Sequence, residues 1–246
     1  MRHIVETGTD VAQVCFFDPA TLPADFDTQL STNSLETFQK LSKSGLFWWK
    51  ETGADGAYLF HFYVNSEIPG PVKEHLEDPQ KMDLFRVVSG TIWACGVEYA
   101  ALNPAEGRER RRKGGLAKNP HMGGNFEIPA GEYSLTAWRT EWPEEMLQEA
   151  LEKVLGKDRV KRDERLGKMT GIFFFVTVIS TVALLMFAVR RPTMKLLWAA
   201  AVVVCLWFVL VRFFKACRKM ETSSPRREIE REFPSIVIQL ISKAKS

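Results

Sequence analysis

A chain of 246 residues has room for one globular domain with appended segments, because single domains usually span about 100–200 residues. The net charge of +3 conceals an uneven distribution: residues 1–165 contain 20 Lys and Arg against 26 Asp and Glu, whereas residues 166–246 contain 13 against 4. The acidic part would repel phosphates, which argues against a nucleic-acid partner. A basic protein or a cationic ligand suits the acidic part, and an anionic lipid surface suits the basic part.

The cysteines and the N-terminus limit what can be inferred about disulfide bonds and about targeting. Only Cys15 and Cys95 could pair within the acidic part, because Cys205 and Cys217 lie in or just beyond an apolar run. The sequence contains neither a disulfide framework nor a CxxC zinc spacing. Residues 1–10 have no apolar run behind a positive charge, so we expect no secretory signal peptide there.

The first elements expected along the chain are a strand and a short helix. Val11–Phe17 is an apolar stretch closed by a proline-bearing loop, which predicts a strand. Asn33, followed three residues later by Glu36, predicts a helix that begins with a capping box. Gly45 is placed to end this helix in the left-handed conformation. The helix should pack one apolar stripe on the core, formed by Leu35, Phe38 and Leu41.

Aromatic and β-branched residues then predict a β-hairpin. Leu46–Lys50 and Ala57–Asn65 read as strands, and the intervening residues 52–56 contain the glycines and the aspartate that favour a tight turn. The next strand candidate, Leu84–Tyr99, is the longest. We expect its glycines to bend it or to introduce a bulge.

The remaining pattern completes a β-rich domain. Residues 103–124 form a hydrophilic, arginine-rich loop, residues 132–139 alternate as a strand does, and residues 142–145 begin a helix. We expect residues 1–142 to be a soluble domain of the α+β class, mainly an antiparallel β-sandwich or half-barrel with one or two helices. Residues 143–168 should be a charged, amphipathic connecting helix.

Two apolar stretches predict a transmembrane hairpin after this domain. Residues 169–189 comprise 21 residues without a charge, enough at about 1.5 Å per residue to cross a hydrocarbon core of about 30 Å. Residues 196–214 form a second span if Arg212 extends its side chain toward water. Lys and Arg are more abundant outside the hairpin than in its turn, 190–195, which favours cytoplasmic termini. We therefore expect a multi-pass protein of the inner (plasma) membrane.

The C-terminal residues 215–246 are basic and amphipathic. Three interpretations of this tail stay open. It lies on lipid headgroups, it docks on the preceding domain, or it is partly disordered.

The titratable residues show no catalytic or metal-binding pattern. None of the histidines belongs to an HxH or HExxH motif, namely His3, His61, His75 and His121. Cys15 lies in an apolar strand with no histidine near it in sequence, which is typical of an inert, packed thiol. We expect no enzymatic activity, no catalytic residue, no cofactor and no metal.

One stretch resembles a known family. Phe126–Trp138 reads FEIPAGEYSLTAW, and its IPAGEY turn and strand resemble small β-rich bacterial immunity proteins and competence nuclease inhibitor-like proteins. The likeness extends loosely to the strand after Asp55-Gly56 and to residues 89–97. This resemblance implies a domain that binds a cognate toxin as a stoichiometric inhibitor. A cupin enzyme is disfavoured, because Tyr133 stands where cupins place a metal-binding histidine.

The leading functional hypothesis is a membrane-anchored immunity protein that binds its toxin. The alternative is a membrane effector or sensor whose soluble domain binds a ligand and whose hairpin forms a homo-oligomer. Composition and expected exposure select nine candidate partner-binding residues: Trp48, Trp49, Asp55, His61, Glu74, Asp78, Arg110, Arg111 and Arg112. The candidate lipid-facing or anchoring residues are Phe173, Phe174, Trp198, Trp207, Arg212 and Lys215.

Overall fold

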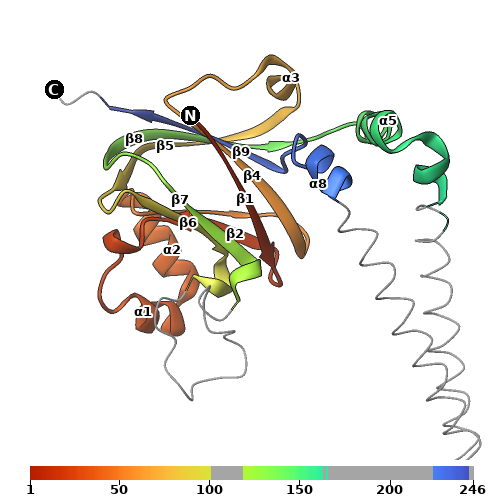
Figure 1. The fold of residues 1–246 in the computed structure, drawn as a ribbon. Helices are drawn as coiled ribbons and strands as arrows, with labels where there is room; N and C mark the ends of the chain where they lie inside the picture. The colour runs from red at the N-terminus through yellow and green to blue at the C-terminus, as the bar shows by residue number, and fades with distance from the viewer. Residues whose placement is uncertain (101–118, 163–164, 166–223, 244–246) are drawn as a thin grey trace, which may run out of the picture. The chain divides into compact units, whose positions relative to one another are not determined.

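The computed structural model describes residues 1–100, 119–162, 165 and 224–243. The chain divides into two compact units, one formed by Met1–Trp142 with Phe233–Ser246 and the other by Pro143–Glu232. The first unit contains two β-sheets that face each other as a sandwich (Figure 1). The β-rich architecture with mainly antiparallel sheets and few helices confirms the expected fold class at this level.

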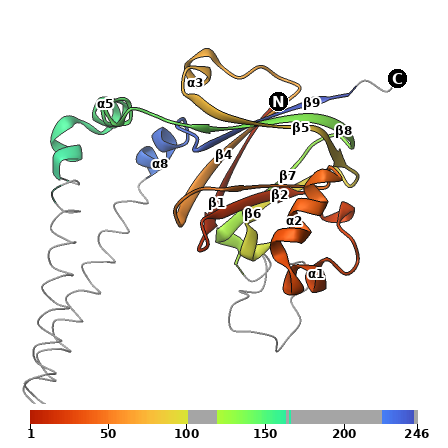
Figure 2. The ribbon, with the colours of Figure 1, turned by 180° about the vertical axis from the view of Figure 1, so that it is seen from behind.

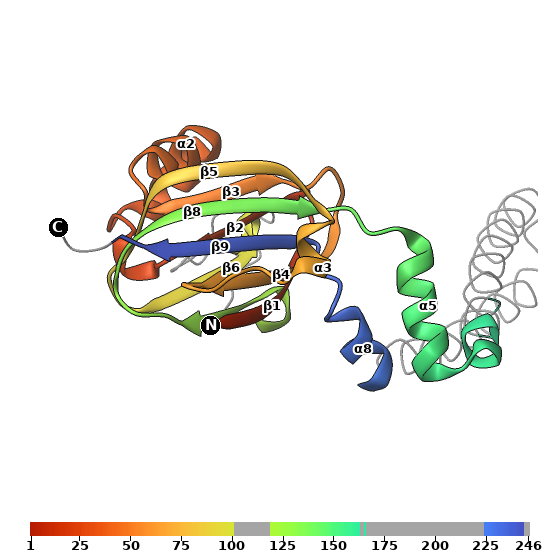
Figure 3. The same ribbon diagram turned by 90° about the horizontal axis from the view of Figure 1, so that it is seen from above.

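The larger sheet has five strands in the spatial order β1-β4-β9-β8-β5. All neighbouring strands are antiparallel except β4 and β9, which run parallel. Figure 3 looks onto this sheet and shows β9 between β8 and β4. The strands are β1 (Arg2–Thr9), β4 (Gly56–Val64), β5 (Leu76–Val87), β8 (Gly131–Thr140) and β9 (Ile236–Ser242).

The smaller sheet has four antiparallel strands in the order β3-β2-β6-β7. Its strands are β2 (Gln13–Phe17), β3 (Phe47–Glu51), β6 (Thr91–Gly96) and β7 (Gly123–Glu127). Strand β3 lies at one edge and β7 at the other. At the β7 edge this sheet packs against β1, the edge strand of the larger sheet, so β3 and β5 form the opposite edge of the sandwich.

Aromatic side chains fill the space between the two sheets. Phe16 stacks on Trp48 with ring centroids 4.9 Å apart and meets Phe62 and Phe85 edge to face. All four side chains are fully buried. Successive residues of a strand point to opposite faces of the sheet. The residues next to these four in sequence, such as Phe17, therefore point outward, and another part of the chain must pack on them.

Helices provide that cover on the outer face of the smaller sheet (Figure 2). Phe38 stacks on Phe47, which in turn stacks on Phe17. The helices are α1 (Phe26–Thr32) and α2 (Ser34–Lys43). On the outer face of the larger sheet, Val72 of the short helix α3 (Gly70–Lys73) joins a cluster with Tyr63 and Val237.

The expected boundaries of the helix that follows Asn33, which is α2, are confirmed. The Asn33 side chain accepts a hydrogen bond from the Glu36 N–H, as a capping box requires, and donates to the Glu36 carboxylate, while the Asn33 N–H donates to the Gln29 C=O instead. Gly45 has φ +74° after the end of α2. There its C=O accepts a hydrogen bond from the Arg86 N–H at 2.8 Å, which ties the helix end to β5.

The expected β-hairpin is wrong. Strand β3 pairs with β2 and strand β4 pairs with β1 and β9, so the two strands belong to different sheets. Residues 52–55 carry the chain from one sheet to the other, with Gly53 at φ +80°. The single strand expected at 84–99 is also two strands, β5 and β6, which are joined by a turn at Gly90 with φ +81°.

The C-terminal residues complete the sandwich. Strand β9 lies between β4 and β8, and Ile236, Val237, Ile238 and Leu240 are buried. Of the three interpretations of the tail, docking on the domain therefore holds for residues 236–242, which form an inner strand rather than a surface segment.

The second unit contains α5 (Glu144–Leu155) and α8 (Ser224–Glu230), which contact each other. Helix α5 begins at the predicted place, with Glu144 and Glu145 in its first turn, where carboxylates interact favourably with the helix dipole. Its C-terminal end is marked by Gly156 at φ +85°.

The expected location as a multi-pass inner-membrane protein is corrected. Among the described residues, none of the helices combines the length and apolarity needed to cross a bilayer. The two stretches that suggested a hairpin, 169–189 and 196–214, and the turn between them lie outside the described residues.

Candidate functional site

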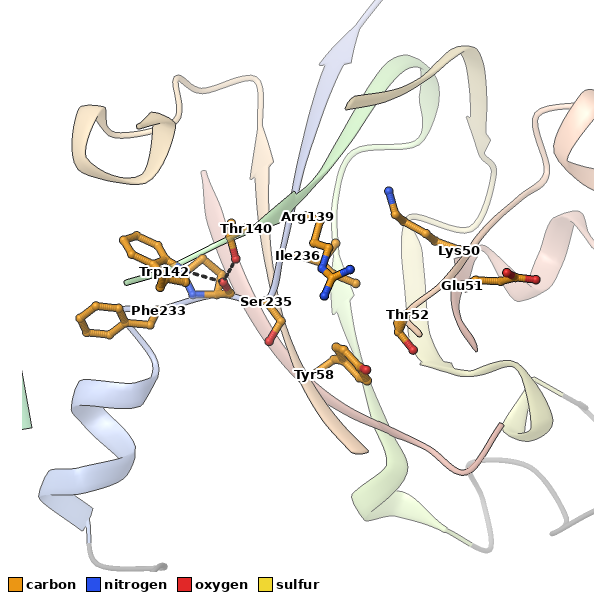
Figure 4. Close-up of a pocket in the computed structure, with 11 residues that line it drawn as sticks. Lys50, Glu51, Thr52, Tyr58, Arg139, Thr140, Trp142, Phe233, Ser235 and Ile236 are labelled. Atoms are coloured by element: carbon orange, nitrogen blue, oxygen red, sulfur yellow. Dashed lines mark hydrogen bonds between the residues drawn. The ribbon is translucent and has the colours of Figure 1, made fainter. Parts of the chain in front are cut away.

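A pocket of about 280 Å³ opens at one end of the sandwich (Figure 4). We call it the end pocket. Strand β3 of the smaller sheet supplies one wall, and strands β4, β8 and β9 of the larger sheet supply the other. Its lining residues are Lys50, Glu51, Thr52, Tyr58, Arg139, Thr140, Trp142, Phe233, Pro234, Ser235 and Ile236.

The segment that leads into β9 is fixed to both neighbouring strands. The C=O of Pro234 accepts hydrogen bonds from the Thr140 hydroxyl and, at 2.9 Å, from the Trp142 indole N–H. Ser235 exchanges hydrogen bonds with Leu59: its N–H donates to the Leu59 C=O at 2.9 Å, and its hydroxyl accepts from the Leu59 N–H at 3.3 Å. Hydrogen bonds to both neighbouring strands therefore hold the floor of the end pocket in place.

The charged side chains of the end pocket have different environments. The Lys50 ammonium donates to the Asp78 carboxylate at 2.5 Å and to the Asp78 C=O at 3.3 Å. This ammonium holds the pKa of Asp78 below its ordinary value. Arg139 is exposed, and among the described residues no carboxylate lies within ion-pair distance of its guanidinium.

A wider groove of about 600 Å³ adjoins the end pocket and shares Lys50 and Glu51 with it. We call it the edge groove, because it runs between the two edge strands β3 and β5 and below helix α2. Its lining residues are Gln39, Ser42, Lys43, Trp49, Lys50, Glu51, Asp78, Pro79 and Gln80.

The two edge strands of this groove differ in their capacity to pair. Strand β5 has a register shift between Glu77 and Gln80, Asp78 has φ +49°, and Pro79 has no N–H. A bulge and a proline are devices that prevent a further strand from adding to an edge. Strand β3 has neither device.

Hydrogen bonds fix the direction of the β3 backbone. Thr52 donates its N–H to Ala12 at 2.8 Å, on the β2 side, while the Phe47 C=O accepts from the Ser42 hydroxyl at 2.8 Å, on the opposite side. In an antiparallel pair the inward and outward residues alternate. The N–H and C=O groups of Trp49 and Glu51 therefore point away from β2, beyond the edge of the sheet and toward the edge groove.

Two carboxyl groups lie together beside this groove. The side chains of Glu77 and Glu141 lie near each other, and their interaction, with the repulsion between the two groups, raises the pKa of Glu77. Arg139 acts in the opposite direction but more weakly. A cation from outside would relieve the repulsion, so this pair, which adjoins the groove where Glu77 precedes Asp78, favours positive charge.

The structure places the nine partner-binding candidates in different environments. Trp49 and Asp78 both line the edge groove. Trp48 and His61 line neither the groove nor the pocket, and both side chains are fully buried, Trp48 between the sheets and His61 on the outer face of the larger sheet. Asp55 and Glu74 are exposed but do not line the groove or the pocket.

The remaining candidates lie outside the described residues. These are the arginine run of the loop and the lipid-facing or anchoring set, namely Arg110, Arg111, Arg112, Phe173, Phe174, Trp198, Trp207, Arg212 and Lys215.

Two contributors to the site were not found from the sequence. Arg139 carries no local signal, because a charged residue at the end of an alternating strand usually faces solvent. Phe233, whose ring meets Trp142 edge to face at 5.0 Å, lies 91 positions further along the chain, so its place could be predicted only with knowledge of β9. Hydrogen-bond register, rather than composition, identifies the outward backbone of Trp49 and Glu51.

The described residues favour neither metal nor thiol chemistry. Among the described residues, no group of three or more His, Cys, Asp or Glu could hold a metal ion. Cys15 and Cys95 are directly opposite in the β2–β6 pair, with Sγ atoms 3.8 Å apart, and both are fully buried and free. Burial raises the pKa of the Cys15 thiol well above its ordinary value, which disfavours the nucleophilic thiolate.

Comparisons with known proteins assign no family. No protein-family model matches the chain, and no curated protein matches it. A solved structure described as "Crocagin biosynthetic gene J" is similar over 56% of this chain and 75% of that chain, with 14% sequence identity and a TM-score of 0.37. A likeness of this extent carries no argument about fold or function.

Proposed function

We propose that the sandwich domain binds a basic protein partner in the edge groove and acts as a stoichiometric inhibitor of that partner. The observation that carries the proposal is the outer edge of β3, with which no strand of the described residues pairs. There, the N–H and C=O groups of Trp49 and Glu51 face the edge groove, whose lining offers several side chains to a partner. An extended segment of a partner can pair with such an edge, gaining affinity from its main chain and specificity from its side chains.

Charge supports a basic partner. Residues 1–100 contain 14 Asp and Glu against seven Lys and Arg. In the groove, Lys50 is neutralised by Asp78, and the other charged lining residues are Lys43 and Glu51. Beside the groove, Glu77 and Glu141 repel each other. A lysine or arginine of the partner placed between these two carboxylates would gain an ion pair and remove the repulsion. Long-range attraction between an acidic and a basic surface also speeds association.

The inhibitory role follows from the resemblance of Phe126–Trp138 to immunity and nuclease-inhibitor proteins. A stoichiometric inhibitor needs a rigid recognition surface and no catalytic group. Strands β3 and β5 provide such a surface, since each is fixed to a sandwich with an aromatic core. The proposal therefore requires no chemistry from the described residues beyond binding.

The experiment captures partners with the tagged full-length chain in its native host and identifies them by mass spectrometry. Three forms are compared: the natural chain, Glu141→Lys beside the groove, and Glu127→Lys on β7 at the opposite edge. Both glutamates are exposed, so the two variants carry the same charge change at different places. We expect a basic protein in one-to-one ratio with the natural chain and with Glu127→Lys, and at least tenfold weaker binding to Glu141→Lys. Equal retention by all three forms would contradict binding at the groove.

A second comparison tests pairing with the β3 edge. Glu51→Pro removes an outward N–H, whereas Glu51→Ala removes the side chain and keeps the N–H. We expect the proline variant alone to lose the partner. Inhibition is tested by measuring the activity or toxicity of the captured protein with and without an equimolar amount of the full chain. Unchanged activity would refute the inhibitory role even if binding is retained.

A further inference from the structure

We propose that the end pocket is a second binding site, which takes the carboxylate of an organic acid with a compact apolar group. Arg139 would hold the carboxylate, and the ring of Tyr58 beside it would contact the apolar group. The proposal rests on the geometry of the end pocket and does not depend on protein binding in the edge groove.

The hydrogen-bond donors of the lining identify the kind of ligand. The Thr52 and Tyr58 hydroxyls donate to the Ala54 C=O at 3.0 Å and 2.6 Å. The Thr140 hydroxyl and the Trp142 indole donate to the Pro234 C=O. These donors are engaged by the backbone, and the Lys50 ammonium is engaged by Asp78. The guanidinium of Arg139 is thus the strong donor that the lining leaves for a ligand, and its ligand must be an acceptor.

The position of the charges selects an anion. In Figure 4 the guanidinium of Arg139 is directed toward the space bordered by Tyr58 and Thr52, whereas the carboxylate of Glu51 is directed away from it. Asp78 is occupied by Lys50. Glu77 lies opposite Arg139 in the β5–β8 pair and interacts with it electrostatically, but the two side chains form no ion pair. An arginine in this position presents a planar fork of N–H groups, which matches the two oxygens of a carboxylate.

The rest of the lining favours an apolar group attached to that carboxylate. Tyr58 is half-buried beside the Arg139 guanidinium, whereas the edge-to-face pair of Trp142 and Phe233 lies at the far end of the lining, beyond Ser235 (Figure 4). The volume of about 280 Å³ lies near the lower limit of small-molecule sites, which usually measure about 300–1,000 Å³. A single aromatic or branched aliphatic group fits this space, and a nucleotide does not.

The test uses four probes with the full-length chain and measures dissociation constants by calorimetry. Phenylacetate is compared with phenylacetamide, its neutral isostere. A tetrapeptide that ends in phenylalanine with a free carboxylate is compared with the same peptide amidated. We expect each binding acid to bind at least tenfold more tightly than its amide. Binding of phenylacetate alone assigns the site to free organic acids, and binding of the peptide alone assigns it to a protein C-terminus.

Two arginine variants place the binding in the end pocket. Arg139→Gln keeps a polar side chain and removes the charge, and we expect it to abolish the difference between acid and amide. Arg86→Gln is the matched control, because Arg86 is also exposed on the larger sheet but lies outside the pocket, 3.4 Å from Glu132. The proposal is overturned if neither acid binds, if the amides bind as tightly as the acids, or if Arg139→Gln binds the acids as the natural chain does.

Discussion

Asp18 offers a sharp test of how the sandwich is held together. Its side chain is fully buried after β2. One carboxylate oxygen accepts from the Val88 and Ser89 N–H groups at 2.6 and 2.7 Å, and the other accepts from the Ala20 N–H at 2.9 Å and the Ser89 hydroxyl at 2.6 Å. These bonds join residues 18–20, which follow β2, to the turn between β5 and β6, which connects the two sheets.

Replacing Asp18 with alanine removes all four bonds. A hydrogen bond to a charged group contributes about 1.5–3 kcal/mol, but the Val88 and Ser89 N–H groups lie near the surface and regain water. Counting all four bonds at about 1 kcal/mol each, below the full range because exposed groups regain water, gives a loss of about 4 kcal/mol in the free energy of unfolding. Asparagine cannot accept at both positions, so Asp18→Asn should lose about half as much.

Urea unfolding followed by tryptophan fluorescence measures these losses. Asp55→Ala is the control, because Asp55 is an exposed aspartate for which we expect a change within about 0.5 kcal/mol. A loss below about 1 kcal/mol for Asp18→Ala would refute the view that this carboxylate fixes the connection between the sheets.

Two further predictions concern backbone conformation and pH. Gly45→Ala places a Cβ 2.5 Å from the Leu84 C=O at φ +74°, so we expect a loss of about 3 kcal/mol in urea unfolding, against about 1 kcal/mol for Gly53→Ala, where φ is +80° and the space is open. Burial raises the pKa of Glu98 above its ordinary 4.5. The folded state therefore binds this proton more readily than the unfolded state, and the free energy of unfolding should fall as pH rises from 4.5 through the raised pKa. Glu98→Gln should lack this fall, and parallel stability curves for the two proteins between pH 4 and 7 would contradict the assignment.

Local signals in the sequence predicted local structure well. The cap of α2 depends on Asn33 and Glu36, which are three residues apart, and the end of the helix depends on the conformational freedom of Gly45. The strand at 131–140 and the start of α5 likewise follow from contiguous residues. Each of these features is decided within one or two turns of chain, where spacing alone carries the physics.

Features that depend on distant pairing could not be predicted in the same way. Residues 52–56 look like a hairpin turn, but hairpin pairing competes with pairing to β1 and β2, and the buried faces of both sheets decide the outcome. Strand β9 looked like an amphipathic tail. Its inner position explains why its apolar run is nearly continuous, since a strand covered on both faces needs no polar side.

The candidate site shows the same division. Trp48 and Trp49 are adjacent and chemically identical, yet only Trp49 reaches the edge groove, because alternation places Trp48 between the sheets. His61 is buried because its outward face is also covered. Arg139 acquires its importance only when β9 and the Phe233 segment close the end pocket around it.

The central claim, that a basic protein partner pairs with the β3 edge and lies in the edge groove, is tested most directly by hydrogen–deuterium exchange of the purified complex. We expect binding to slow exchange of the backbone amides at residues 47–51, most of all at Trp49 and Glu51, and to leave the amides of β7 at the opposite edge unchanged. Protection at β7 with no change at β3 would contradict the proposed mode of binding.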